Sequence, residues 1–270
     1  MELNHEVVTE TPRPSATVVL LRDDRGQGLE VFLLRRHTAS AVLGGAYVFP
    51  GGKLDDADCT PEACAPFQAE APHWHHQLGE AQLAVAQVVG LYLAATREVR
   101  EECGLVLLPQ HLIPWSRWIT PKQPSVTNRR FDTRFFVAAL PPGQEPVHDD
   151  VEAIESLWLT PRDALRRFWA QDLSLAPPQI MTLVSLVEHP NVDDVIRHAR
   201  SQRPARILPE PFDDADGVRT ICYPGDPKHS VPMRAFAGPT RLRFVNGRFE
   251  PEAGLDALLN PAPLGQESER

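Results

Sequence analysis

The stretch REVREECGL, residues 97–105, places three glutamates within five positions of a segment that is rich in helix-forming residues. In an α-helix, side chains three and four positions apart share a face, so Glu98, Glu101 and Glu102 project to one side. Like charges at this spacing destabilise an isolated helix by about 0.2–0.5 kcal/mol per pair. The pattern therefore predicts positive charge beside these three carboxylates.

The residues around the glutamates support a helix over 81–102. Arg97 lies four positions before the second glutamate, within reach of an intrahelical ion pair. Val99 and Cys103 form an apolar stripe that anchors the helix in a core, and Gly104 suits a helix C-terminus.

Three clustered carboxylates provide the oxygen ligands that hard divalent cations prefer. Mg²⁺ or Mn²⁺ held there neutralises phosphate charge and lowers the pKa of an attacking water. The alternative is a solvated acidic helix end, which three glutamates alone do not exclude. The sequence upstream decides between the two.

That upstream sequence, FPGGK at 49–53, together with REVREECGL resembles the signature of the nudix hydrolases. Gly52 occupies the signature glycine, but Asp58 stands where the signature has a glutamate. Residues 59–96 number 38 where the signature has seven, which gives an insertion at about 59–89.

The split signature is similar to one nudix subfamily, the peroxisomal coenzyme A diphosphatases, which carry a long insertion inside the box. FPGGKLDDAD follows their FPGG-x-x-D-x-x-D pattern, and RRFDTRFFVAALP and VEAIESLWLTPRDAL also resemble them. The resemblance covers about 13–190. It implies a nudix α/β/α sandwich with a mixed central sheet, and a C-terminal extension at 191–270 that packs on the domain.

The resemblance also implies residue roles. The metal ligands are Glu98, Glu101, Glu102 and the Gly52 carbonyl, with Mg²⁺ or Mn²⁺ as cofactor. Glu98 and Glu101 are the catalytic carboxylates, and Arg97 orients a glutamate. Water attacks one phosphorus of a diphosphate, and the protein contributes position and charge.

Five more residues are candidates for contact with substrate. Arg36 ends a predicted strand close to the glycine loop, and Arg129 and Arg130 adjoin another predicted strand. Arginine forms a rigid fork that suits phosphate. Glu152 and Glu155 belong to a downstream acidic segment of the kind that adds a carboxylate to nudix sites. Strand-end and surface roles are the alternatives for all five.

Strands are predicted at 15–23 and 29–36 as a hairpin, at 129–140, and in short pieces of the extension. Helices are predicted from Pro161, in PPQIMTLVSLVEHP and in VDDVIRHAR, while 59–80 is predicted to be irregular.

The insertion has three open roles: it covers the site, sets specificity or forms part of a homodimer interface. A zinc site is a weaker alternative for its cysteines and histidines, Cys59, Cys64, His73, His75 and His76.

Composition limits the classes of binding partner and the cellular compartment that we expect for this protein. The 270 residues carry a formal net charge of −9, which argues against a broad electrostatic grip on nucleic acid or membrane. Four cysteines form no disulfide framework, and the polar first ten residues do not read as a signal peptide. A cytoplasmic enzyme with a small nucleotide substrate is the expectation.

The favoured function is metal-dependent hydrolysis of the diphosphate in coenzyme A or acyl-coenzyme A. ADP-ribose, NADH or a dinucleotide is the alternative substrate within the same class. A catalytically inactive nudix domain that binds a nucleotide is the rival from another class, and loss of a helix carboxylate would favour it. All three glutamates are present.

Overall fold

Two long apolar strands form the hairpin that begins the fold. The computed structural model describes residues 3–4, 6–24, 26, 28–40 and 43–264. β1 (Arg13–Asp24) pairs antiparallel with β2 (Gly28–Arg36), and Leu21 lies opposite Val31. The predicted hairpin is confirmed.

These two strands lie within a mixed eight-stranded sheet. The other strands are β3 (Tyr47–Val48), β4 (Gly51–Lys53), β5 (Ile113–Ile119), β6 (Phe131–Ala139), β7 (Ala153–Leu159) and β8 (Ala205–Ile207). The order is β3-β2-β1-β6-β5-β8, with β4 paired to β1 and β7 to β2. The pairs β1–β6 and β5–β8 are parallel and the other strand pairs are antiparallel, so the predicted mixed sheet is confirmed.

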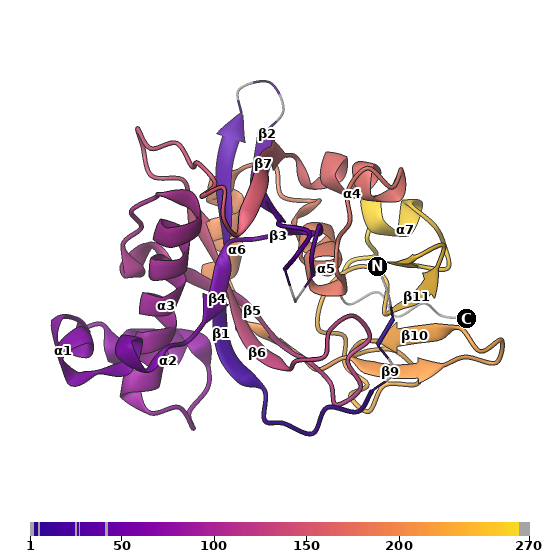
Figure 1. Cartoon of the computed structure of the whole chain (residues 1–270), viewed down its shortest axis with the longest axis horizontal. Coiled ribbons are helices and arrows are strands. Elements are labelled where there is room, and N and C mark those ends of the chain that lie inside the picture. Colours follow the sequence, from indigo (N-terminus) through magenta and orange to yellow (C-terminus); the bar gives the residue numbers. More distant parts are fainter. Residues whose placement is uncertain (1–2, 5, 25, 27, 41–42, 265–270) are drawn as a thin grey trace.

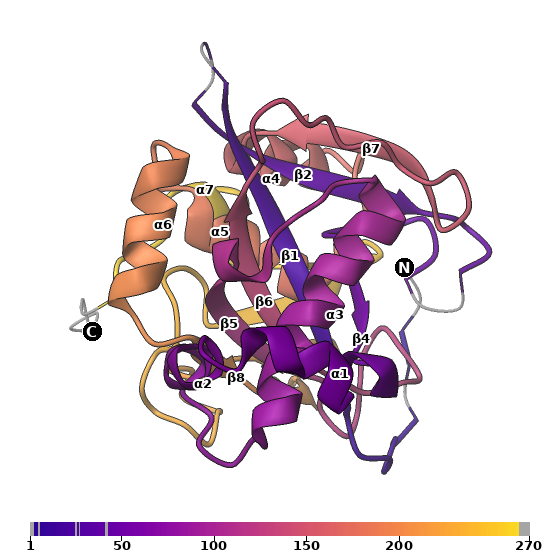
Figure 2. The same ribbon diagram turned by 90° about the vertical axis from the view of Figure 1, so that its left-hand side faces the viewer.

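Helices cover both faces of the sheet (Figures 1 and 2). One face carries α1 (Pro61–Cys64), α2 (Ala71–Leu78) and α3 (Val85–Cys103); the other carries α4 (Pro161–Trp169), α5 (Pro177–Leu186) and α6 (Val192–Ser201). Strand residues alternate between the faces, so Val18 and Phe32 pack with α3 while Val19 and Val31 pack with α4–α6. The result is the predicted α/β/α sandwich.

The insertion is more ordered than the sequence indicated. The prediction of an irregular 59–80 is wrong, because α1, α2 and 3-10 turns at Asp56–Cys59 and Ala65–Phe67 occupy it. Trp74 of α2 is buried and stacks on Tyr92 of α3, with ring centroids 4.4 Å apart. Gly79 ends α2 in the left-handed conformation. The insertion therefore packs into the core beneath α3.

The C-terminal segment adds a second, antiparallel sheet. Its strands are β9 (Glu210–Asp213), β10 (Arg219–Cys222), β11 (Arg241–Val245) and β12 (Arg248–Glu250), followed by α7 (Asp256–Leu259). Ile221, Tyr223 and Leu242 are buried in the same core cluster as Trp118 of β5. Among the described residues, no helix is both long and apolar enough to span a membrane.

Candidate active site

The three glutamates belong to helix α3, whose C-terminal half packs against the glycine-rich turn at Gly51 and Gly52. Glu98 and Glu102 are one turn apart and lie against Gly51 and Gly52, with Glu102 only 5% exposed. The side chain of Glu101 is 58% exposed at the rim. The structure therefore brings two carboxylates together and leaves the third in solvent.

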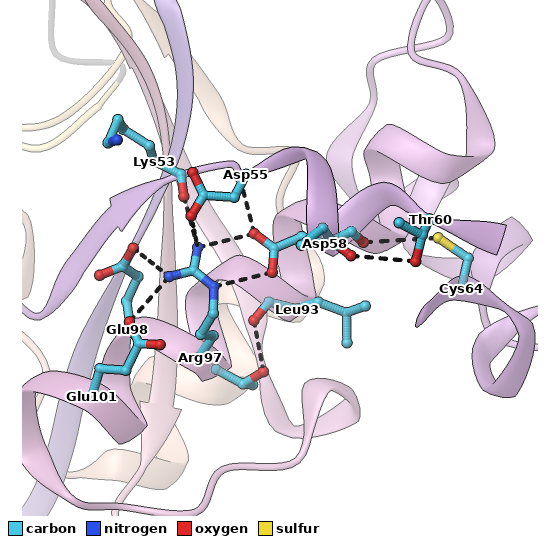
Figure 3. A network of polar contacts seen from close by, with 11 residues as sticks. Lys53, Asp55, Asp58, Thr60, Cys64, Leu93, Arg97, Glu98 and Glu101 are labelled. Carbon is cyan, nitrogen blue, oxygen red and sulfur yellow. Dashed lines mark hydrogen bonds and ion pairs between the residues drawn. The ribbon is translucent and has the colours of Figure 1, made fainter. Parts of the chain in front are cut away.

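Arg97 is the hub of the polar network at this site (Figure 3). Its Nε and Nη2 donate to the two carboxylate oxygens of Asp58 at 3.1 and 2.9 Å. Nη1 donates to Glu98 at 2.8 Å and to Glu101 at 3.2 Å, and Nη2 also donates to the Lys53 carbonyl at 3.0 Å. The bonds to Asp58 are the main cause of a raised pKa of Arg97. One guanidinium thus holds two of the three glutamates in place.

Asp58 stands where the nudix signature has a glutamate, and it is buried at 6% exposure. It accepts two bonds from Arg97 although 38 residues separate them in sequence. Its Oδ2 also accepts the backbone N–H of Asp55 at 3.0 Å, which closes the 3-10 turn. The insertion therefore leaves from and returns to the same point in space.

A side chain at Gly51 would meet the backbone of β1, and a side chain at Gly52 would displace the Glu98 carboxyl group. A Cβ on Gly52 would lie 2.2 Å from Oε1 of Glu98, and a Cβ on Gly51 would lie 2.4 Å from the Ala16 carbonyl oxygen. The Gly51 N–H donates to Oε2 of Glu102 at 3.0 Å. The glycines thus allow the backbone to touch both carboxylates.

The site holds negative charge that the protein only partly compensates. Burial raises the pKa of Glu102 to about 8, and the neighbouring Glu98 and Glu152 also raise it. Burial raises the pKa of Glu98 as well, against the opposing effect of Arg97. A buried carboxylate with an elevated pKa fits a position that a cation completes.

Of the five candidate substrate contacts, Glu152 and Arg36 lie beside this cluster. Arg36 Nη2 is 3.8 Å from Glu152 Oε2. The positive charge of Arg36 lowers the pKa of Glu102, and the negative charge of Glu152 raises it. Asp149 accepts the backbone N–H of Glu152 at 3.0 Å and so shapes the loop that presents it. Arg36, at the end of β2, and Glu152, in the segment before β7, thus lie beside the helix carboxylates.

The structure does not bring the other three candidates to the cluster. Glu155 accepts from Arg35 and from the Tyr47 hydroxyl, and Tyr47 packs in the core on the α4–α6 face of the sheet. Arg130 donates to the carbonyls of Thr120 and Glu10 and ties the N-terminal segment down, and its neighbour Arg129 is exposed.

Two residues that hold members of this cluster in place were missing from the predicted set of site residues. Asp58 holds Arg97, and Gly51 holds Glu102. The FPGG-x-x-D-x-x-D pattern was the available signal for Asp58. Within the described ranges, no three or more histidine, cysteine, aspartate or glutamate side chains are gathered closely enough to form a metal site as they stand. The carboxylates of Glu98 and Glu101 instead both accept hydrogen bonds from Arg97.

The comparisons with known proteins agree with this fold. The family model for the NUDT19 Nudix domain matches residues 110–186, which run from just before β5 to the end of α5. A crystal structure of a nudix hydrolase from Alicyclobacillus acidocaldarius superposes with a TM-score of 0.54 at 25% identity, and covers 73% of this chain and 99% of that one. The chain belongs to the nudix hydrolase superfamily.

Its curated relatives include acyl-coenzyme A diphosphatases. The human acyl-coenzyme A diphosphatase NUDT19 is 25% identical over 292 residues, which cover 79% of this chain and 76% of that protein. The Gallus gallus protein of the same name is 24% identical and covers 74% of each chain. A putative nudix hydrolase 7 from Caenorhabditis elegans is 25% identical over 81% of this chain and 75% of its own length.

Proposed function

We propose that this nudix hydrolase cleaves the diphosphate linkage of coenzyme A or acyl-coenzyme A with the help of a divalent metal. One observation carries the proposal: Glu98 and Glu102 converge on the Gly51–Gly52 turn while Arg97 bridges the two halves of the interrupted box. The similarity to acyl-coenzyme A diphosphatases over about three quarters of both chains supports the substrate.

The residues present fit Mg²⁺ or Mn²⁺. Glu98 and Glu102 offer buried oxygen ligands whose pKa values are raised by burial, the exposed Glu101 adds a third carboxylate, and Gly52 provides a carbonyl. When bound, such a cation neutralises phosphate charge and lowers the pKa of a water molecule. Glu101 would turn from Arg97 to reach such a cation, while Arg97 would keep its bonds to Glu98 and Asp58 and so continue to orient Glu98.

The remaining chemistry belongs to the chain itself. Arg97 orients the carboxylates, and Glu98 or Glu101 accepts the proton of the attacking water. Arg36 lies at the edge of the cluster, where its guanidinium suits a phosphate oxygen. Preorganised charge of this kind supplies much of the rate enhancement in phosphoryl chemistry.

The test is a substrate panel with Mg²⁺ or Mn²⁺: coenzyme A, an acyl-coenzyme A, ADP-ribose, NADH and a diadenosine polyphosphate. Products are identified by mass spectrometry. Cleavage of coenzyme A into 4′-phosphopantetheine and adenosine 3′,5′-bisphosphate is expected, with loss of about 10²-fold or more in Glu101→Gln and Glu102→Gln. Glu62→Gln, on the exposed helix α1, is the matched control.

Turnover of ADP-ribose or NADH but not of coenzyme A would refute coenzyme A as the substrate and would leave the proposed metal-dependent mechanism in place. Nucleotide binding without turnover of any substrate would favour an inactive binding domain.

A further inference from the structure

An apolar pocket lies beside the glycine-rich turn, on the α5 side of the sheet. It has a volume of about 190 Å³. Its walls come from three parts of the chain: the loop 120–127 before β6, the start of α5, and the C-terminal extension through Pro209 and Ile221. The extension therefore supplies part of a pocket whose other walls are the nudix domain.

Thr17 connects this pocket to the carboxylates. It lines the pocket and pairs with Gly51 in the β1–β4 register, and the Gly51 N–H donates to Glu102. Leu43, in the loop between β2 and β3, lines the same pocket. The pocket and α3 lie on opposite faces of the sheet, so one substituent of a diphosphate at Glu98 and Glu102 would pass the β4 edge to reach this opening.

Two buried polar side chains in the pocket wall lack partners. Ser125 is 4% exposed and Gln179 is 7% exposed. Within the part of the chain that the structure describes, neither Ser125 Oγ nor Gln179 Oε1 has a hydrogen-bond partner. Buried polar groups are nearly always paired, so these two indicate a ligand with both donor and acceptor groups.

The pocket suits a narrow chain better than a nucleobase. Pockets that enclose a whole drug-sized ligand are roughly 300–1,000 Å³, so this one receives a single arm of the substrate. Trp118 contacts Phe135, Tyr223 and Phe236, and its indole N–H already donates to Ser116. Its ring is therefore occupied by protein contacts and is not free to stack on a base.

We infer that this pocket binds the pantetheine arm of the substrate, an aliphatic chain with two secondary amides. This inference rests on the proposed coenzyme A function. An amide N–H of the arm donates to Gln179 Oε1, and an amide carbonyl accepts from the Ser125 hydroxyl. The nucleotide half of the substrate extends away from the pocket on the other side of the diphosphate.

The experiment measures dissociation constants of the two halves of coenzyme A, 4′-phosphopantetheine and adenosine 3′,5′-bisphosphate, by calorimetry in the presence of Mg²⁺. Val126→Trp fills the pocket from the loop 120–127, and Gln179→Leu removes the amide. Val231→Trp, at an exposed position of the extension, is the matched control. Circular dichroism checks the folding of each variant, and Gln179→Leu decides alone if Val126→Trp does not fold.

We expect both pocket variants to weaken 4′-phosphopantetheine about tenfold or more, with adenosine 3′,5′-bisphosphate changed by less than about twofold. Equal weakening of both halves, weakening of the adenosine half alone, no change, or a wild-type protein that does not bind 4′-phosphopantetheine would each overturn the inference. Failure of the wild-type protein to hydrolyse coenzyme A would instead refute the proposed function. The two failures are therefore distinguishable.

Discussion

At the scale of single residues, Arg97 joins the two halves of the interrupted box. Its contacts with Asp58 and the Lys53 carbonyl reach the first half, and its contacts with Glu98 and Glu101 stay within the second. The guanidinium is planar and carries five donors, so a lysine could not make all of these bonds. The site depends on this one side chain for its geometry.

The Asp58–Arg97 pair gives the first prediction. Asp58→Asn removes the negative charge and replaces one of the two acceptor oxygens, so we expect the free energy of unfolding to fall by about 2 kcal/mol and kcat to fall at least about tenfold. Denaturant unfolding and substrate turnover measure the two effects. Asp56→Asn, exposed in the same turn, should change neither. An Asp58→Asn enzyme with wild-type kcat would show that Arg97 is held by its other contacts.

Glu102 gives a prediction about pH. Its pKa is about 8 in the folded protein, whereas an unfolded glutamate has a pKa of about 4.3. Between these values the folded state binds the extra proton, so the stability of the metal-free protein falls as pH rises from about 4 through 8. Each kcal/mol lost lowers Tm by roughly 2–4 °C for a chain of this size.

The measurement is Tm between pH 5 and 9 with a chelator present, for wild type and Glu102→Gln. The variant cannot ionise at this position, so its Tm should fall less over that range. Parallel curves for the two proteins would contradict the prediction. Glu101→Gln is the control, because the Glu101 side chain is mostly in solvent.

The sequence predicted the shared face of the glutamates because helical spacing sets it locally. It did not predict the Asp58–Arg97 contact, since 38 intervening residues hide the return of the chain to its starting point. Glu155 illustrates a different limit. In a strand, neighbouring side chains face opposite ways, so composition alone could not say that Glu155 faces away from the helix carboxylates.

At the scale of elements, β4 and α3 approach each other so closely that the Glu98 carboxyl group fills the space beside Gly52. A Cβ at this position would lie 2.2–2.6 Å from the Glu98 carboxyl group. Gly52→Ala should therefore displace Glu98 and lower kcat about 10²-fold, with a smaller effect on Tm, because the carboxylate can rotate toward solvent. Gly26→Ala, whose Cβ would meet nothing nearer than 3.5 Å, is the control. Unchanged kcat in Gly52→Ala would exclude a catalytic role for the Glu98 position.

The insertion is fixed to the sheet by a buried ionic network. Glu80, between α2 and α3, accepts from Arg134 at 2.9 and 2.6 Å and lies 2.6 Å from Arg117. Both arginines also contact Asp132. The negative charge of Glu80 thus compensates two guanidinium groups that are largely buried against the sheet.

Removal of this anchor should be strongly destabilising. Glu80→Ala leaves Arg134, at 3% exposure, to share Asp132 with Arg117, so the free energy of unfolding should fall by about 3 kcal/mol. Denaturant unfolding measures the change, and Glu62→Ala on exposed α1 is the comparison. A loss below about 1 kcal/mol would mean that the insertion is anchored mainly by the Trp74–Tyr92 stack.

Local sequence patterns predicted the elements that have strong periodicity, such as the β1–β2 hairpin and the helix that begins at Pro161. They did not predict α2. Eight residues are too few for a stable isolated helix, so α2 owes its conformation to the contact of Trp74 with Tyr92. Tertiary packing of this kind has no signature in a short window of sequence.

At the scale of the whole molecule, the C-terminal extension and the nudix domain share one core. Trp118 of β5 packs against Tyr223 and Phe236, and Arg248 of β12 lies over the Trp169 ring of α4 at 4.4 Å. The extension also lines the pocket beside Thr17. Contacts this extensive indicate that the two parts unfold together.

Leu242 tests this cooperativity, because it is fully buried where β11 meets the shared core. Leu242→Ala should lower the free energy of unfolding by about 2–5 kcal/mol. Tryptophan fluorescence and catalytic activity, followed along the same denaturant series, should then shift to the same lower midpoint, since a two-state transition gives coincident curves. Val231→Ala, an exposed position in the same extension, should leave both midpoints in place. If activity kept its wild-type midpoint while fluorescence shifted, the extension would unfold separately, and the pocket at Pro209 and Ile221 would open without loss of the catalytic helix.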